Sequence, residues 1–162
     1  DLASAMEAYE EAIASSIHLE AQSFYNLLNL CDGLEKHVHV GMPKPNTGDE
    51  KPEKVVRPVD HKTRRDYAFR LKEHMAKLKL PLNETAYTAI VKVLVRNKDY
   101  EKAELVLDES ENVQQCRPKL RLYASLLTAY CEERYMAEAL KCWLRITKQG
   151  LEISERESLV LM

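Results

Sequence analysis

Apolar residues recur in the same order in two consecutive segments of the chain. Across a displacement of 36 residues, the matching positions are Tyr87 with Tyr123, Ile90 with Leu126, Val91 with Leu127 and Leu94 with Tyr130. Within each set the spacing is i, i+3, i+4, i+7, which is one face of an α-helix. A polar break and a second helix follow in each segment, where the small Ala103 or Ala139 allows close helix packing. The pattern predicts helix hairpins of about 35 residues, the size of helical solenoid repeats.

The same template fits upstream, where Phe24, Leu27, Leu28 and Cys31 have the same spacing. We therefore predict an all-α fold, an α-α superhelix of hairpins, with Tyr87, Tyr123, Tyr130 and Trp143 in its core. The predicted units are residues 1–18 as the second helix of a truncated repeat, 20–83 as a repeat with an inserted flexible loop at 32–62, 84–119 and 120–154 as further repeats, and 155–162 as the start of the next helix.

The 32–62 segment holds four of the six prolines and three of the four glycines, and no periodicity survives in it. This composition predicts a mobile loop between the two helices of one hairpin. A metal cluster of Cys31, His37, His39 and His61 is the alternative. Structural zinc needs four ordered ligands, and no zinc-type spacing is present, so we favour a solvated loop beside a core cysteine and predict no metal site.

The composition is that of an ordinary soluble domain, with 31% charged and 45% hydrophobic residues and a net charge of −2. A nucleic-acid partner would therefore be bound by a local basic surface rather than by overall charge. The four cysteines lack C-x-x-C spacing. Three of them fall inside helical apolar patterns, where a free thiol behaves as a small hydrophobic residue, and this favours a reducing compartment. No apolar run has the length of a membrane span, so no membrane partner is expected. Because the pattern is already under way at Asp1, we expect a fragment.

Each predicted first helix has polar positions beside its apolar stripe. One step after the leading aromatic stand Tyr25, Thr88 and Ala124, and four residues further on stand Asn29, Lys92 and Thr128. Such i, i+4 positions point into one groove, where helical-repeat proteins read RNA by base stacking and hydrogen bonding. We expect Tyr25 to stack on a base, Thr88 to hydrogen-bond a base and Lys92 to contact a phosphate. A register shifted by one residue replaces Tyr25 by Asn26. The alternative for each polar residue is a solvated helix face.

Three stretches of the chain resemble a known family: "YNLLNLC", "PLNETAYTAIVKVLV" and "RPKLRLYASLLTAYCEE". They are similar to pentatricopeptide repeats, and most of all to the RNA-binding repeat domain of protein-only ribonuclease P. The resemblance implies a monomeric module that grips precursor tRNA, while a Mg²⁺-dependent nuclease domain after the repeats removes the 5′ leader. It also implies that this segment needs no cofactor and works in the mitochondrion or another organelle, or alternatively in the nucleus.

The resemblance adds the closing residue of each unit as a second base-reading position, which here is Asn83, Lys119 or Ser154. The pairs Thr88 with Lys119 and Ala124 with Ser154 are not strong recognition pairs of that family. This departure favours recognition of a folded RNA shape, aided by Arg117, Lys119 and Arg121 near the groove entrance.

No catalytic residue is assigned, because the aspartates are scattered over loops and helix edges instead of converging on one metal site. We expect the segment to bind precursor tRNA without cleaving it. Two alternatives stay open: a protein scaffold of the tetratricopeptide kind, and another organellar pentatricopeptide RNA-binding protein. The W-x-x-L-G-x-x-Y signature of tetratricopeptide repeats is missing, which counts against the scaffold.

Overall fold

The structure is a computed structural model that describes residues 1–33, 59–113 and 116–151. These residues form α-helices and no strand, which confirms the all-α prediction. The helices are α1 (Leu2–Ala14), α2 (Ala21–Asp32), α3 (His61–Lys77), α4 (Glu84–Arg96), α5 (Tyr100–Asn112), α6 (Leu120–Glu132) and α7 (Met136–Lys148).

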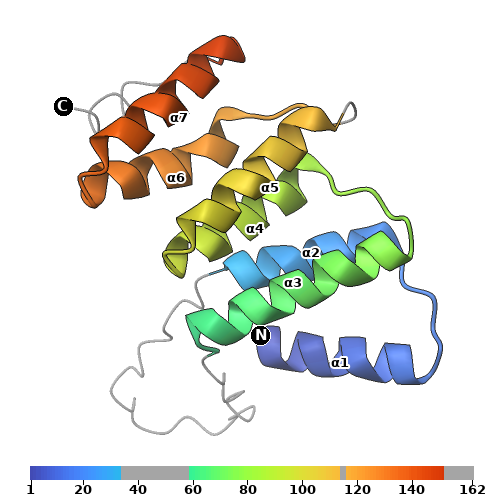
Figure 1. The fold of residues 1–162 in the computed structure, drawn as a ribbon. Coiled ribbons are helices and arrows are strands. Elements are labelled where there is room, and N and C mark those ends of the chain that lie inside the picture. The colour runs from blue at the N-terminus through green and yellow to red at the C-terminus, as the bar shows by residue number, and fades with distance from the viewer. Residues whose placement is uncertain (34–58, 114–115, 152–162) are drawn as a thin grey trace, which may run out of the picture.

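The helices form hairpins that stack along the chain, as Figure 1 shows. Helix α2 packs against α4, and α4 packs against α6, so these three make one row, which we call the first helices. Helices α3, α5 and α7 each pack against the first helix of their own hairpin, and α1 packs against α2. We call these four the second helices. This two-layered stack is the predicted solenoid.

The unit boundaries stay a prediction, and the described helices fall within them as follows. Unit 20–83 holds α2 and α3, unit 84–119 holds α4 and α5, and unit 120–154 holds α6 and α7. Most of the predicted loop, residues 34–58, and the predicted helix at 155–162 lie outside the described residues.

Five helices end in the same backbone turn. One residue adopts a positive φ between 54° and 67°, and the next amide donates to the carbonyl five residues earlier, at 2.8–3.2 Å. The residues with positive φ are Ser16, Lys79, Lys98, Arg134 and Gly150. This is the Schellman ending, which satisfies carbonyls that the helix leaves free. Lys98 and Arg134 are 36 residues apart, so the backbone repeats with the same period as the apolar pattern.

Buried tyrosines fill the core between the layers. Tyr87, Tyr123 and Tyr130 are at most 3% exposed, which confirms their prediction as core residues. Their hydroxyls all donate to glutamates of α5, Tyr87 to Glu109 at 3.3 Å, Tyr123 to Glu111 at 2.8 Å and Tyr130 to Glu104 at 2.6 Å. Burial, followed by the nearby glutamate charge and hydrogen bond, raises the pKa of each tyrosine. The ring is thus buried while its polar end is satisfied, as buried tyrosines require.

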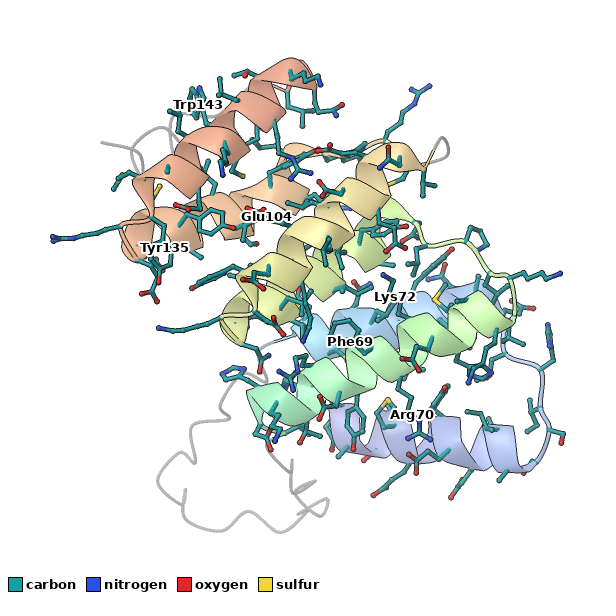
Figure 2. The ribbon with its side chains drawn as sticks, in the orientation of Figure 1. Phe69, Arg70, Lys72, Glu104, Tyr135 and Trp143 are labelled. Atoms are coloured by element: carbon teal, nitrogen blue, oxygen red, sulfur yellow. The ribbon has the colours of Figure 1, made fainter. Side chains whose placement is uncertain are left out.

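The prediction that Trp143 is a full core residue needs correction. Trp143 is only partly buried against the core, although its repeat equivalent Leu107 is completely buried. Leu107 lies next to α6 and α7, which cover it, whereas the described residues provide no hairpin after α7. Met136, Leu140 and Leu144 of α7 are also 57–62% exposed. Figure 2 shows Trp143 on this outermost helix.

Arg64 ties α3 to the end of α2. Its side chain is buried, with the residue only 6% exposed. Nη1 donates to the carbonyls of Leu30, Cys31 and Gly33 at 3.0, 3.3 and 2.5 Å, and Nε donates to the carbonyl of Val59 at 3.0 Å. One guanidinium therefore joins both chain segments that border the stretch between α2 and α3, and it satisfies the last carbonyls of α2.

Because two thiols are buried, we expect the protein to lose stability in alkaline solution. Burial raises the pKa of Cys31 and of Cys142 to about 12, from 9.0. The unfolded chain releases these protons first, so the free energy of unfolding should fall as pH rises from 9 towards 12. By pH 10 the expected loss is roughly 1 kcal/mol per thiol.

Urea unfolding at pH 8 and at pH 10 measures this loss. Variants Cys31→Ala and Cys142→Ala, combined, should show a smaller decline between the two pH values, whatever their stability at pH 8. An equal decline in the variant and the original chain would contradict the assignment to these thiols.

Candidate nucleic-acid interface

The row of first helices presents one continuous polar surface, which we call the first-helix face. Its members are at least partly exposed, and two of its positions recur in all three helices, one with Gln22, Thr85 and Arg121 and the other with Asn29, Lys92 and Thr128. They are Gln22, Asn26 and Asn29 of α2, Thr85, Lys92 and Arg96 of α4, and Arg121, Ala124, Ser125 and Thr128 of α6. Three helices in side-by-side contact thus bring amides, hydroxyls and cations from distant sequence positions to one side of the molecule.

On α2, the structure separates Tyr25 from Asn26. The Tyr25 hydroxyl donates to the carbonyl of Pro81 at 2.7 Å, and its ring is partly buried against the core. Asn26 is exposed and accepts a hydrogen bond from Gln22 at 3.0 Å, and Asn29 is exposed as well. Gln22 and the two asparagines are therefore accessible polar groups of α2. The stacking role predicted for Tyr25 stays a prediction, and it requires the Pro81 contact to open.

At the start of α4, Thr88 is 5% exposed, and its hydroxyl donates to the carbonyl of Glu84 at 2.9 Å. The same hydroxyl lies 3.0 Å from the carboxylate of Glu84. A base contact by Thr88 stays a prediction, but the structure places its hydroxyl in an internal network, because α4 is surrounded by α2, α5 and α6.

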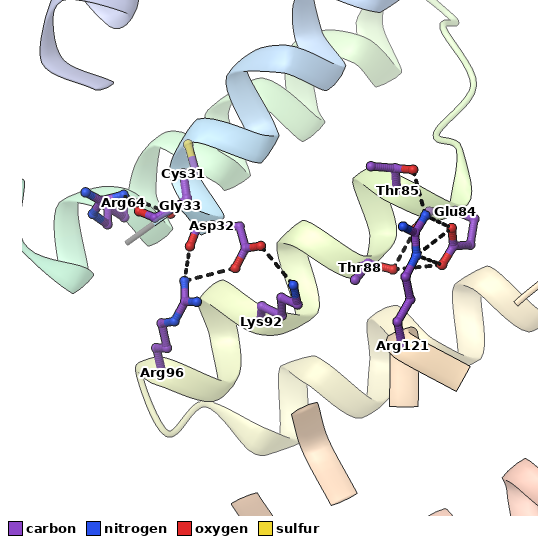
Figure 3. A network of polar contacts seen from close by, with 10 residues as sticks. All are labelled: Cys31, Asp32, Gly33, Arg64, Glu84, Thr85, Thr88, Lys92, Arg96 and Arg121. Carbon is purple, nitrogen blue, oxygen red and sulfur yellow. Dashed lines mark hydrogen bonds and ion pairs between the residues drawn. The ribbon is translucent and has the colours of Figure 1, made fainter. Parts of the chain in front are cut away.

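The carboxylate of Glu84 also holds Arg121 of α6 (Figure 3). Arg121 donates from Nε at 2.8 and 3.1 Å and from Nη2, and Nη2 also donates to the Thr85 hydroxyl at 2.9 Å. Burial alone would raise the pKa of Glu84, but hydrogen bonds from Arg121 and Thr88 and the charges of Arg121 and Lys119 hold it below its usual value. Arg121 is therefore fixed between α6 and α4.

At the other end of α4, Asp32 holds two cations. Its Oδ2 accepts from Lys92 Nζ at 3.1 Å, and its Oδ1 lies 2.9 Å from Arg96 Nη1. Arg96 also donates to the backbone carbonyl of Asp32. These contacts join the ends of α2 and α4, and Figure 3 shows them on the same helix α4 as the Glu84 group. Lys92, which was predicted to reach a phosphate, is thus already paired with a carboxylate.

The remaining predicted residues lie near the start of α4 and α6. Asn83 is exposed and caps α4 by accepting from the amide of Ala86 at 2.8 Å. Lys119 precedes α6 and is exposed. Arg117 is exposed and forms no hydrogen bond or ion pair with any other described residue. Ser154 lies outside the described residues.

Sequence reasoning did not single out three residues of this charge network, namely Asp32, Glu84 and Arg96. A signal was present for one of them. Glu84 and Arg121 are 37 residues apart, one repeat plus one position, so opposite charges at that offset meet across stacked first helices. The contact of Asp32 with Lys92 spans 60 residues, and the insertion between α2 and α3 hides the repeat period there.

Within the described ranges, no group of three or more His, Cys, Asp or Glu side chains is placed to hold a metal ion. None of the helices described here combines the length and the apolar character needed to cross a membrane.

Stacked hairpins of about 35 residues, with a polar face on the first helices, define a helical-repeat protein. A sequence model described as the pentacotripeptide-repeat region of PRORP matches residues 54–162, more than half of the chain. The chain therefore belongs to this family. A comparison with curated protein sequences gave no match.

Solved structures agree with this class. The chain is similar to nuclear proteinaceous RNase P 2 (PRORP2) of A. thaliana, with a TM-score of 0.78 and 23% identity, over 99% of this chain and 30% of that one. It is also similar to the pentatricopeptide-repeat domain of A. thaliana protein-only RNase P 1 (PRORP1), solved in complex with tRNA, with a TM-score of 0.74 and 19% identity, over 99% of this chain and 70% of that one. At these identities the likeness establishes the fold. The chain spans about 30% of the length of PRORP2.

Proposed function

We propose that this chain is an RNA-binding repeat module that grips precursor tRNA for removal of the 5′ leader by a protein-only ribonuclease P. The metallonuclease domain and its Mg²⁺ would lie outside this chain. The observation that carries the proposal is the first-helix face, a row of amides, hydroxyls and cations on a chain of the PRORP repeat family. The related domain of PRORP1 was solved in complex with tRNA, which supports the same partner here.

The side chains on this face fit the two kinds of contact that RNA offers. Asn26, Asn29 and Thr128 supply donors and acceptors for base edges and 2′-hydroxyls. Cationic side chains supply phosphate contacts, and those available are Lys92, Arg96, Arg117, Lys119 and Arg121. A base-by-base code is disfavoured in the centre of the row, since Thr88 is buried and Ala124 has no polar side-chain group. We therefore propose recognition of a folded RNA shape.

We further propose that the module acts as a monomer, in the mitochondrion or another organelle, with the nucleus as the alternative. All four cysteines are free thiols in the structure, which fits a reducing compartment. Fractionation of cells that express the tagged full-length protein tests the compartment, and recovery in an oxidising, secretory compartment would contradict it.

Another organellar pentatricopeptide protein with a different RNA target would share this fold and face. A tetratricopeptide-type scaffold is disfavoured by the family match. One binding experiment separates these three hypotheses. It compares the affinity of this chain for a precursor tRNA with its affinity for an unstructured RNA of equal length. Tighter binding of the precursor tRNA supports the proposal, equal binding points to another RNA-binding role, and absence of binding to either RNA favours a scaffold.

Salt dependence tests which cations contact phosphates. Each phosphate contact contributes about −0.7 to −0.9 to the slope of log affinity against log salt. Replacing Lys92, Arg117 and Arg121 together by glutamine should therefore reduce the slope for precursor tRNA by about two to three. Fluorescence anisotropy at several salt concentrations measures it.

A matched control removes the same charge from the other layer. Lys77, Lys141 and Lys148 are exposed on the second helices, and their replacement by glutamine should leave the slope unchanged. If both triple variants change the slope equally, or if neither does, the first-helix face is not the phosphate-binding surface.

A further inference from the structure

Every cation on the first-helix face that the structure pairs is held by one of two carboxylates. Asp32 at the end of α2 holds Lys92 and Arg96 of α4, and Glu84 at the start of α4 holds Arg121 of α6. Both carboxylates thus join neighbouring first helices, one at each end of the face, as Figure 3 shows. The cations that would meet phosphates are already partly neutralised by the protein itself.

The two partners of each pair on the first-helix face differ in side-chain exposure, and they do so in the opposite sense from two ion pairs between second helices. On the first-helix face the carboxylate lies inside and the cation outside: the side chain of Glu84 is 11% exposed and that of Arg121 51%, while that of Asp32 is 18% exposed and that of Lys92 36%. Each cation therefore keeps an open side towards solvent.

Two ion pairs between second helices have the reverse order. Asp108 is 56% exposed and its partner Arg145 24%, and Glu109 is 43% exposed and its partner Lys72 22%. Arg145 also pairs with Glu111 of α5, and there the two side chains are almost equally exposed, at 24% and 22%. On the first-helix face each cation is more exposed than the carboxylate that holds it, so an approaching anion meets the cations first.

We propose that Asp32 and Glu84 are selectivity-determining residues that compete with RNA phosphates for the cations of the first-helix face. This inference rests on the proposed RNA-binding function and deepens it. A phosphate can approach the open side of Arg121 or Lys92, but the carboxylate behind the cation lowers the attraction. An unstructured polyanion that contacts one cation at a time therefore gains little binding free energy.

A folded RNA gains more binding free energy, because its rigid backbone places several phosphates over both ends of the face at once. The summed phosphate contacts then outweigh the competition from the two carboxylates. The two carboxylates thus weaken binding of unstructured RNA more than binding of folded RNA. Their expected effect is a larger ratio between the two affinities.

The test uses Asp32→Asn and Glu84→Gln, which keep the side-chain size and remove one negative charge each. Affinity for an unstructured RNA and for a precursor tRNA is measured by fluorescence anisotropy at one fixed salt concentration. Each variant should bind the unstructured RNA about two- to fivefold more tightly, the range that partly exposed ion pairs contribute. The gain for precursor tRNA should be smaller, so the ratio of the two affinities falls.

Asp108→Asn is the matched control, because it makes the same charge change in an ion pair between second helices. It should leave both affinities unchanged, which separates the inference from an effect of overall charge. Circular dichroism checks folding of each variant. If Asp32→Asn does not fold, Glu84→Gln tests the same inference at the other end of the face, where Thr88 and Arg121 can still donate to the amide oxygen.

The outcomes separate this inference from the proposed function. If the original chain binds precursor tRNA but neither variant binds unstructured RNA more tightly than Asp108→Asn does, the inference is overturned and the proposed function stands. An unchanged affinity ratio would likewise overturn it. If the original chain binds neither RNA, the proposed function fails and the inference fails with it.

Discussion

Leu127→Ala is expected to lower the free energy of unfolding by about 2–5 kcal/mol, the range for truncation of a fully buried leucine. Leu127 lies on α6, which packs against both α4 and α7, and it is only 2% exposed. The substitution removes apolar contacts in the core between α4, α6 and α7 and leaves a cavity, because two neighbouring helices hold α6 in place and limit its collapse. Urea unfolding followed by circular dichroism measures the loss.

Leu105→Ala is the matched control, since the same atoms are removed from a residue that is 65% exposed on α5. Its effect should stay within about 0.5 kcal/mol, as for surface substitutions in general. Trp143→Ala should fall between the two, because Trp143 is partly buried. Equal losses for Leu127→Ala and Leu105→Ala would show that the first helices do not form the packed row described here.

Arg64→Ala is expected to cost about 1.5–3 kcal/mol, the range for loss of hydrogen bonds from a charged donor. The guanidinium donates to four backbone carbonyls, three of them at the end of α2 and one at Val59. Alanine leaves these acceptors without their donor and opens a space beside the buried Cys31. Thermal and urea unfolding measure the loss, and amide hydrogen exchange locates it at the end of α2.

Arg64→Lys should recover part of the stability, since an ammonium reaches some of these carbonyls but lacks the planar fork of donors. Arg70→Ala on the same helix is the control. Its side chain is 51% exposed in an ion pair with Glu10, so the expected cost is below about 1 kcal/mol. A cost for Arg64→Ala no larger than that for Arg70→Ala would refute the role of Arg64 as the link between α2 and α3.

Much of the fold was predictable because a repeated local pattern specifies it. The i, i+3, i+4, i+7 spacing from Tyr87 and from Tyr123 identifies an apolar helix face, and its recurrence after 36 residues predicts the stacked hairpins that the structure shows. The sequence pattern overestimated the burial of Trp143, which is only partly buried. The sequence pattern equates Trp143 with Leu107, but burial depends on what packs on the other side, and α7 has no following hairpin among the described residues.

The first-helix face was predictable only as a set of positions. Counting along a helix places Asn29, Lys92 and Thr128 at equivalent sites, and the structure brings their helices together. Counting along a helix does not reveal that the Tyr25 hydroxyl contacts Pro81 or that Thr88 is buried against Glu84. Those contacts depend on the distance between neighbouring repeats, which no single helix specifies.

By itself, the sequence determined the helices, their pairing into hairpins, the period of the stack and the residues of its core, because each follows from the local spacing of apolar side chains. Only the tertiary structure decided which charges meet. Asp32 reaches Lys92 across 60 residues and Arg121 reaches Glu84 across 37, because stacking brings helices together independently of their separation along the chain. Ion pairs at such distances carry no periodic signal, so the balance of charge on the first-helix face became visible only in the folded chain.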